Sequence, residues 1–114
     1  MEFLLMMLDG VTLRPWTEEQ YQSALVRMGA FTEPLKKAGV WKDAGGLGPD
    51  FDGARVRVSD GKTTVVDGPF EEAQDVVGGF AVLECDTREQ AIEIAKKCPA
   101  AEWTTLEVRQ IWRH

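Results

Sequence analysis

Hydrophobic residues occupy every position from Phe3 to Leu8. Because successive side chains of a β-strand point to opposite faces, a run that is apolar throughout predicts a central strand covered on both sides. A short strand is predicted to open at Val40-Trp41, before a loop from Gly45, and further strands are predicted at 80–85 and 106–112, where apolar and β-prone residues lie between turn or helix signals.

A first helix is predicted to begin at Thr17, because Thr17 and Gln20 have the spacing of a capping box. Its end is predicted at Gly39, which suits the residue after a helix. Pro34 lies inside it and predicts a kink or a restart, since proline lacks the backbone donor. The apolar stripe of this helix is Tyr21, Ala24, Leu25, Met28, Phe31, Leu35 and Ala38.

A second helix is predicted after Asp86 or Thr87, either of which can cap its first turn. Ala91, Ile92, Ile94, Ala95 and Cys98 form its apolar stripe. Pro99 follows directly and is expected to stop it.

Asp60-Gly61 lies between two β-prone segments, 55–58 and 63–66, and predicts a tight hairpin. The order is therefore strand–helix–strand, an inserted hairpin, then strand–helix–strand. We expect an α+β fold of the ferredoxin-like type, two split βαβ halves forming one antiparallel sheet with both helices on one face. The other face then needs a cover, and a second copy of the chain is the simplest one. We therefore expect a homodimer of the dimeric α/β-barrel type.

The 114 residues correspond to a single domain, 1–114, and 44% of them are hydrophobic, which suffices for a core. The net charge of −6 disfavours binding to nucleic acid and to anionic membranes. No apolar run approaches the ~20 residues that a membrane span requires. Cys85 and Cys98 are too few for a secreted disulfide scaffold, so we expect buried thiols and a cytoplasmic protein.

Alternating charged residues suggest a ligand site on the uncovered sheet face. Leu106, Val108 and Trp112 share one face of the last strand, and Glu107 and Arg109 share the other. Arg55 and Arg57 likewise oppose Val56 and Val58. If the apolar set packs on the helices, the arginines point to the open face and could bind a small carboxylate or phosphate between protomers. The alternative is solvated charge or an ion pair within the sheet.

The segment 66–72, Val-Asp-Gly-Pro-Phe-Glu-Glu, is followed by Gly78-Gly79-Phe80. Together with Gly46-Leu47-Gly48-Pro49 and Glu107-Val108-Arg109, it resembles the DGPF signature of the YciI-like (YCII-related) family. The resemblance spans nearly the whole chain and implies a dimeric ferredoxin-like α/β-barrel. It also implies an association with extracytoplasmic-function sigma factors.

The resemblance implies a His–Asp acid–base pair in some members of this family, one branch of which is linked to dehydrochlorination of a chlorinated aromatic. The corresponding positions here are Met28 and Cys98, so both catalytic side chains are replaced. The remaining histidine, His114, is terminal. Catalysis by the family's pair is therefore not expected, and whether the protein is an enzyme stays open.

Asp67 and Phe70 belong to the signature and have two interpretations. In the first, Asp67 lies at the mouth of a cleft as a ligand acceptor or general base. In the second, Asp67 hydrogen-bonds within a turn and Phe70 fills the core. The candidate ligand-binding residues are Arg57, Asp67, Phe70 and Arg109, and Asp67 and Glu72 are the candidate bases of an alternative lyase or isomerase.

No metal or cofactor is expected. The acidic residues Glu71, Glu72 and Asp75 match no calcium loop and are interpreted as surface charge. The glycines at 45–48 lack the lysine of a phosphate-binding loop and are interpreted as a connector. Cys98 has no histidine partner that would make it a nucleophile.

Tryptophan occurs at positions 16, 41, 103 and 112, more often than core packing requires. Trp41 and Trp103 are predicted in the core or at a dimer seam, with contact to a ligand as the alternative.

Overall fold

The computed structural model describes residues 1–8, 16–48, 52–70 and 77–113. Its main sheet has the strand order β2-β5-β1-β6, and neighbouring strands pair antiparallel. The four strands are β1 (Glu2–Met7), β2 (Trp41–Gly46), β5 (Gly79–Glu84) and β6 (Leu106–Gln110). This order is that of two interleaved strand–helix–strand units, so the predicted ferredoxin-like α+β fold with an antiparallel sheet is confirmed.

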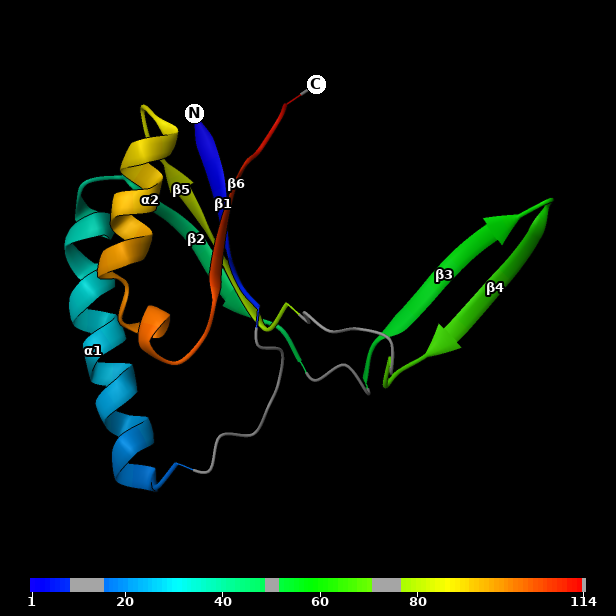
Figure 1. The fold of residues 1–114 in the computed structure, drawn as a ribbon, viewed down its shortest axis with the longest axis horizontal. Helices are drawn as coiled ribbons and strands as arrows, with labels where there is room; N and C mark the ends of the chain where they lie inside the picture. Colours follow the sequence, from blue (N-terminus) through cyan, green and yellow to red (C-terminus); the bar gives the residue numbers. More distant parts are fainter. Residues whose placement is uncertain (9–15, 49–51, 71–76, 114) are drawn as a thin grey trace.

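Two helices, α1 (Glu18–Lys37) and α2 (Arg88–Lys97), lie together on one face of the sheet (Figure 1). The capping box of α1 is present: the Gln20 amide donates to Thr17 Oγ1 at 3.1 Å, and the Thr17 amide donates to Gln20 Oε1 at 2.9 Å. The predicted restart at Pro34 is wrong, because α1 continues to Lys37. Pro34 lies in the last turn, where it removes one helical donor, while its carbonyl still accepts from the Ala38 amide at 3.0 Å.

Thr87 is the N-cap of α2, since the Gln90 amide donates to its Oγ1 at 3.1 Å. The helix ends at Lys97, and the short 3₁₀ helix η2 (Pro99–Glu102) leads toward β6. Neither described helix is long and apolar enough to cross a membrane.

The core lies between the sheet and the helices. It consists of Phe3, Leu5, Trp41, Ala81, Leu83, Cys85 and Ala91, with Phe31 and Leu35 of α1 packed against it. The first half of α1 contributes less than its apolar stripe predicts, since Tyr21 is 53% and Leu25 52% exposed. Figure 1 shows the reason: α1 extends past the end of the sheet, and its first turns have no strand beneath them.

Two predicted strand boundaries are wrong. β2 continues to Gly46, so Gly45 and Gly46 belong to the sheet and not to a connector. Gly45 pairs with Phe80 of β5, and a Cβ on Gly45 would lie 3.0 Å from Phe80 Cε1. β6 ends at Gln110, so Trp112 lies beyond it and is 77% exposed instead of packing on the helices.

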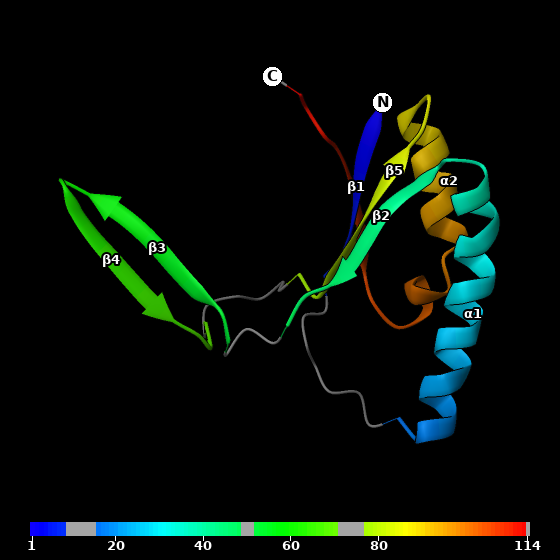
Figure 2. The same ribbon diagram turned by 180° about the vertical axis from the view of Figure 1, so that it is seen from behind.

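The predicted hairpin forms from β3 (Ala54–Ser59) and β4 (Lys62–Asp67). Asp60 and Gly61 form its turn, with φ angles of 50° and 75°, the left-handed values that a two-residue hairpin turn requires. At its base the Gly68 amide donates to the Gly53 carbonyl at 2.9 Å. These strands form a separate two-stranded sheet, and Figures 1 and 2 show that it projects from the main sheet on the side away from the helices.

Candidate functional site

The face of the main sheet that points away from the helices has an apolar centre. Phe3, Leu5, Ala81 and Leu83 are buried beneath the helices, so the residues that alternate with them lie on the opposite face. These are Leu4 and Met6 of β1 and Phe80 and Val82 of β5, which we call the open-face patch. The register places Leu4 beside Val82 and Met6 beside Phe80, so the four side chains are contiguous.

Glu107 and Arg109 of β6 border this patch. The register pairs Arg109 with Leu4 and Glu107 with Met6, so both lie on the open face as alternation predicted. The Arg109 Nε atom lies 4.0 Å from Glu107 Oε2, and the Arg109 side chain is 73% exposed. An ion pair this long and exposed is weak, so the guanidinium of Arg109 can bind another anion.

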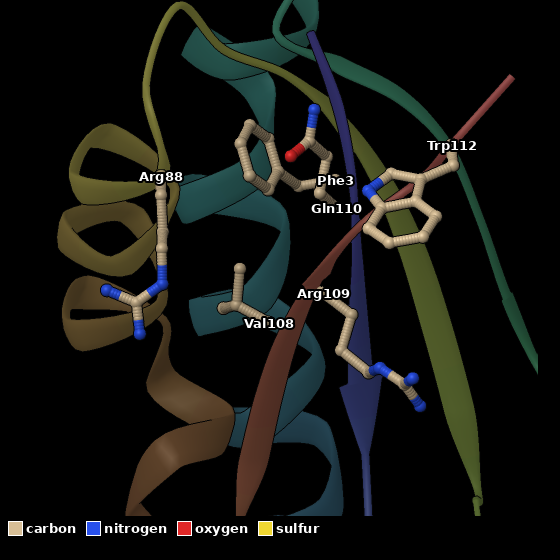
Figure 3. A pocket seen from close by; sticks show the side chains of 6 residues that line it. All are labelled: Phe3, Arg88, Val108, Arg109, Gln110 and Trp112. Carbon is tan, nitrogen blue, oxygen red and sulfur yellow. The ribbon is translucent and has the colours of Figure 1, made fainter.

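A cavity of about 480 Å³ opens at the outer edge of β6. It is lined by Phe3, Arg88, Val108, Arg109, Gln110 and Trp112 (Figure 3). Arg88 comes from the first turn of α2, on the helix side of β6, whereas Arg109 and Trp112 lie on the other side. Its volume falls within the range of about 300–1,000 Å³ typical of small-molecule sites.

The hairpin residues do not join this cavity within the chain, which corrects one prediction. Arg55 and Arg57 were expected to share the open face with Arg109, but they belong to the separate sheet of β3 and β4. Alternation along a strand determines which residues share a face, but not which sheet the strand joins. The guanidinium of Arg55 lies over the ring of Phe70, 4.0 Å from its centroid. Asp67 is exposed at the end of β4.

Phe70 is half-buried and lies outside the core cluster, so the interpretation that it fills the core is wrong. It follows the cis Gly68-Pro69 bond at the base of the hairpin. Glu71, Glu72 and Asp75 lie outside the described residues, and the suggested role of Glu72 as a base stays a prediction.

Met28 and Cys98, the positions at which the family resemblance places a histidine and an aspartate, are in contact. Cys98 Sγ lies 3.9 Å from Met28 Sδ, across the junction of α1 with the end of α2. Burial raises the pKa of the Cys98 thiol above its usual value of 9.0. A thioether has no titratable proton, so this pair of side chains cannot perform acid–base catalysis near neutral pH.

A smaller cavity of about 240 Å³ is lined by residues from the first half of α1 together with Trp16 and Trp103. Their rings meet edge to face with centroids 5.3 Å apart. Arg27 lies 5.8 Å from the centroid of Trp103 and forms an ion pair with Glu102. Trp103 thus packs against another side chain of its own chain, whereas Trp41 is buried in the core as predicted.

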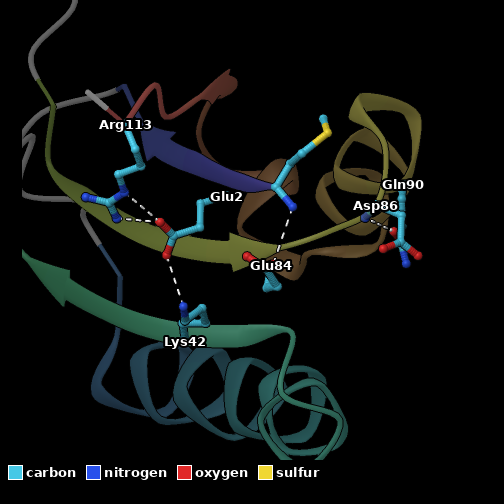
Figure 4. A network of polar contacts seen from close by, with 7 residues as sticks. Glu2, Lys42, Glu84, Asp86, Gln90 and Arg113 are labelled. Atoms are coloured by element: carbon cyan, nitrogen blue, oxygen red, sulfur yellow. Dashed lines mark hydrogen bonds and ion pairs between the residues drawn. The ribbon is translucent and has the colours of Figure 1, made fainter.

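One end of the open face carries a cluster of charges. The Glu2 carboxylate accepts hydrogen bonds from Arg113 and, at 3.1 Å, from Lys42 Nζ (Figure 4). These two cations hold the pKa of Glu2 below its usual value of 4.5, with Arg113 the larger cause. The N-terminal ammonium donates to Glu84 at 3.3 Å, so five charged groups connect β1, β2, β5 and the C-terminal segment.

Among the residues that the structure describes, no group of three or more histidine, cysteine or acidic side chains could hold a metal ion.

Sequence reasoning identified Arg109 but missed Arg88 and Trp112 as cavity residues. Arg88 occupies the first position of a helix, where no periodic pattern marks it, and Trp112 was assigned to the core because β6 was expected to continue through it. β5 and β6 both pair antiparallel with β1, so they are parallel to each other, and the crossover between them starts α2 near the end of β6. This relation could have suggested that Arg88 and Arg109 border the same cavity.

Comparison with known proteins identifies the family. The family model for the YCII-related domain matches residues 1–114. The chain belongs to the YCII-related family. An uncharacterised protein of Rhizobium meliloti (strain 1021) is 29% identical to this YCII-related chain over 105 residues, covering 90% of this chain and 85% of the relative.

A solved structure of similar fold is the 5-chloro-2-hydroxyhydroquinone dehydrochlorinase TftG of Burkholderia phenoliruptrix AC1100, in complex with 2,5-dihydroxybenzoquinone. The TM-score is 0.56 over 100% of this chain and 95% of that one, at 19% sequence identity. The similarity shows that the YCII-related fold is shared.

Proposed function

We propose that this YCII-related chain forms a homodimer and binds a small anionic molecule at the β6 edge of the open sheet face. One observation carries the proposal: two guanidinium groups, those of Arg88 and Arg109, line one cavity of about 480 Å³ in a chain of net charge −6. Cations that border a hollow in an acidic protein favour an anion there.

The chemistry of the lining narrows the class of ligand. Arg109 and Arg88 each have a carboxylate on their own element, Glu107 at 4.0 Å and Glu89 at 3.8 Å. Both ion pairs are exposed and long, so a ligand carboxylate, phosphate or phenolate can replace them with shorter, two-pronged hydrogen bonds. The exposed indole of Trp112 offers a flat surface for a ring. A small, flat oxyanion suits this lining, because it offers oxygen atoms to the guanidinium groups and a ring face to Trp112.

The TftG complex supports this class, because its bound molecule is a small, flat quinone with several oxygen atoms. The family's acid–base pair does not carry over, since Met28 and Cys98 stand at its positions. We therefore propose binding without that reaction. A lyase or isomerase using Asp67 or Glu72 is the alternative, but the exposed Asp67 lies outside the cavity that contains Arg109.

The open-face patch supports the proposed homodimer. Leu4, Met6, Phe80 and Val82 form a contiguous apolar surface that no helix of the described chain covers. Leu4→Glu places a charge on this surface without altering the core beneath the helices. We expect this variant to sediment as a folded monomer, and an unchanged dimer would contradict the proposed interface. The two buried free thiols, Cys85 and Cys98, support a reducing, cytoplasmic location.

A thermal-shift screen tests ligand binding. The panel contains benzoate, inorganic phosphate, phenyl phosphate and 2,5-dihydroxybenzoquinone, each added to wild type, Arg109→Ala and Arg88→Ala. A ligand at ~100 times its Kd stabilises the folded state by ~2.7 kcal/mol, a readable shift for a domain of this size. We expect a shift in wild type that both variants lose, whereas Arg27→Ala, outside the cavity, keeps it.

A shift that survives both substitutions would place the ligand elsewhere and refute the site. The absence of any shift would refute small-anion binding by this panel. The sigma-factor association would then be the stronger prediction, and it would be tested by co-purification from native lysate.

A further inference from the structure

The hairpin of β3 and β4, residues 54–67, which we call the arm, contributes no residue to the hydrophobic core. Every residue of its two strands is exposed. The register pairs Val56 with Val65 and Val58 with Thr63, so the three valines lie on one face of the arm. Their exposures are 66%, 61% and 65% for Val56, Val65 and Val58 respectively.

Such an arm is not expected to stand alone. A two-stranded hairpin is marginally stable in water unless its apolar face is covered by a further strand or a helix. Val56, Val58 and Val65 are β-branched residues that suit a half-buried pleated surface, and their row therefore indicates a surface that packs on something.

The molecule is more extended, and exposes more surface, than a compact monomer of the same length. Its radius of gyration is 16.3 Å, whereas a compact domain of this length has about 13 Å. Its accessible surface is 8235 Å², whereas a folded monomer of this size exposes about 6,200 Å². The excess of about 2,000 Å² exceeds the ~800 Å² that each partner buries in a standard interface.

Charge favours a second copy as the occupant. The arm contains three cations, Arg55, Arg57 and Lys62, and two carboxylates, Asp60 and Asp67. It is therefore net positive in a chain whose net charge is −6. We call the main sheet with its two helices the body. A net positive arm is attracted to the acidic body of another copy and not to other arms.

The position of the arm agrees with this occupant. Figures 1 and 2 show the arm leaving the sheet at one end and rising at an angle on the side away from the helices. This is also the side of the open-face patch. A copy docked on the patch would therefore lie between the sheet and the arm.

We infer that the arm is a dimer clasp, which packs its valine face, Val56, Val58 and Val65, against the body of a second copy of this chain. The inference rests on the proposed homodimer and specifies the segment, the arm, that holds the two copies together. It is independent of which ligand the cavity binds.

The test replaces the valine face without weakening the strands. The triple variant V56T/V58T/V65T keeps β-branched side chains of nearly the same volume but makes the face polar. We expect its dimer dissociation constant, measured by sedimentation equilibrium, to rise at least ~100-fold, since each tenfold change corresponds to ~1.4 kcal/mol. The control Val66→Thr changes a valine that pairs with Arg55 on the opposite face, and is expected to change the constant by less than ~3-fold.

Hydrogen exchange on the wild type gives a second measurement that needs no variant. We expect amides of 54–67 to be protected at concentrations where the dimer forms and to exchange rapidly on dilution into monomers. If the triple variant is misfolded by circular dichroism, the single variant Val65→Thr and this exchange experiment decide the matter.

The outcomes separate the two proposals. A wild type that sediments as a monomer at high micromolar concentration overturns both the homodimer and the clasp. A wild-type dimer whose dissociation constant is unchanged in the triple variant, or whose arm exchanges rapidly within the dimer, overturns the clasp alone.

Discussion

The Sγ atom of Cys98 lies 3.9 Å from the Sδ atom of Met28, at the junction of α1 with the end of α2. Two positions seventy residues apart in the sequence thus face each other where the family resemblance implies a histidine and an aspartate. The scaffold that brings such a pair together is present in this chain. Its chemistry is not, since one residue has no proton to transfer and the other has a raised thiol pKa.

A double-mutant cycle at this junction tests the contact. Cys98→Asp alone places a carboxylate at a site only 2% exposed and is expected to destabilise the fold by about 3 kcal/mol. Adding Met28→His should recover about 1–2 kcal/mol of this loss, because an imidazolium can pair with the buried carboxylate. Urea unfolding of both single variants and the double variant measures the coupling. Strictly additive effects would show that the two side chains do not interact.

Gly45 is required by the ring of Phe80. A Cβ at position 45 would lie 3.0 Å from Phe80 Cε1, so Gly45→Ala is expected to lower the free energy of unfolding by about 1 kcal/mol. The neighbouring variant Gly46→Ala is the control, since a Cβ there meets nothing within 4 Å. Placing Gly45→Ala in a Phe80→Leu background should remove most of the penalty. An equal effect of the two glycine substitutions would contradict a steric cause.

The ion cluster around Glu2 makes stability depend on pH in acid. The folded protein holds the pKa of Glu2 below 4.5, chiefly through the hydrogen bonds from Arg113 and then Lys42. A carboxylate with a lowered folded-state pKa contributes stability above the unfolded-state value, and this contribution is lost as the pH falls below 4.5 toward the folded-state pKa.

Glu2→Gln is therefore expected to be less stable than wild type at pH 7, with the difference shrinking below pH 4.5. Urea unfolding at a series of pH values measures it. Glu33→Gln, which alters an exposed ion pair with Lys37, provides a control with a smaller difference at pH 7. A difference between wild type and Glu2→Gln that persists unchanged in acid would exclude the ionised carboxylate as its source.

Trp112 should report on the proposed ligand site. It is 77% exposed and lines the same cavity as Arg88 and Arg109, so a bound flat anion is expected to shift or quench its fluorescence. Titration with 2,5-dihydroxybenzoquinone in Trp112→Phe corrects for non-specific absorption by this coloured compound. If wild type and Trp112→Phe give the same signal change, the ligand does not contact this indole.

Much of the fold could be predicted because it depends on local chemistry. The capping box of Thr17, the cap at Thr87 and the left-handed turn at Asp60-Gly61 are each determined by a few adjacent residues. The apolar run of β1 likewise predicted a central strand, and β1 lies between β5 and β6. Two helices and a central strand in this order are compatible with few topologies, so the ferredoxin-like α+β fold could be predicted from them.

The site could be predicted only in part, because it depends on tertiary placement. Alternation correctly placed Glu107 and Arg109 on one face of β6. It could not show that Arg55 and Arg57 belong to a second sheet, since their strands have the same pattern as strands of the main sheet. The part played by Arg88 depends on where α2 begins relative to β6, and no periodic pattern contains that information.

The base of the arm has a consequence for how such proteins can diversify. Because the Gly68 amide donates to the Gly53 carbonyl, the arm begins and ends at one place, and no residue of the core cluster lies in between. We therefore expect that changes in the length or sequence of the arm leave the main sheet and its helices folded. If the arm holds the dimer, substitutions confined to its fourteen residues would change which copies of the chain pair and leave the cavity of Arg88 and Arg109 unaltered.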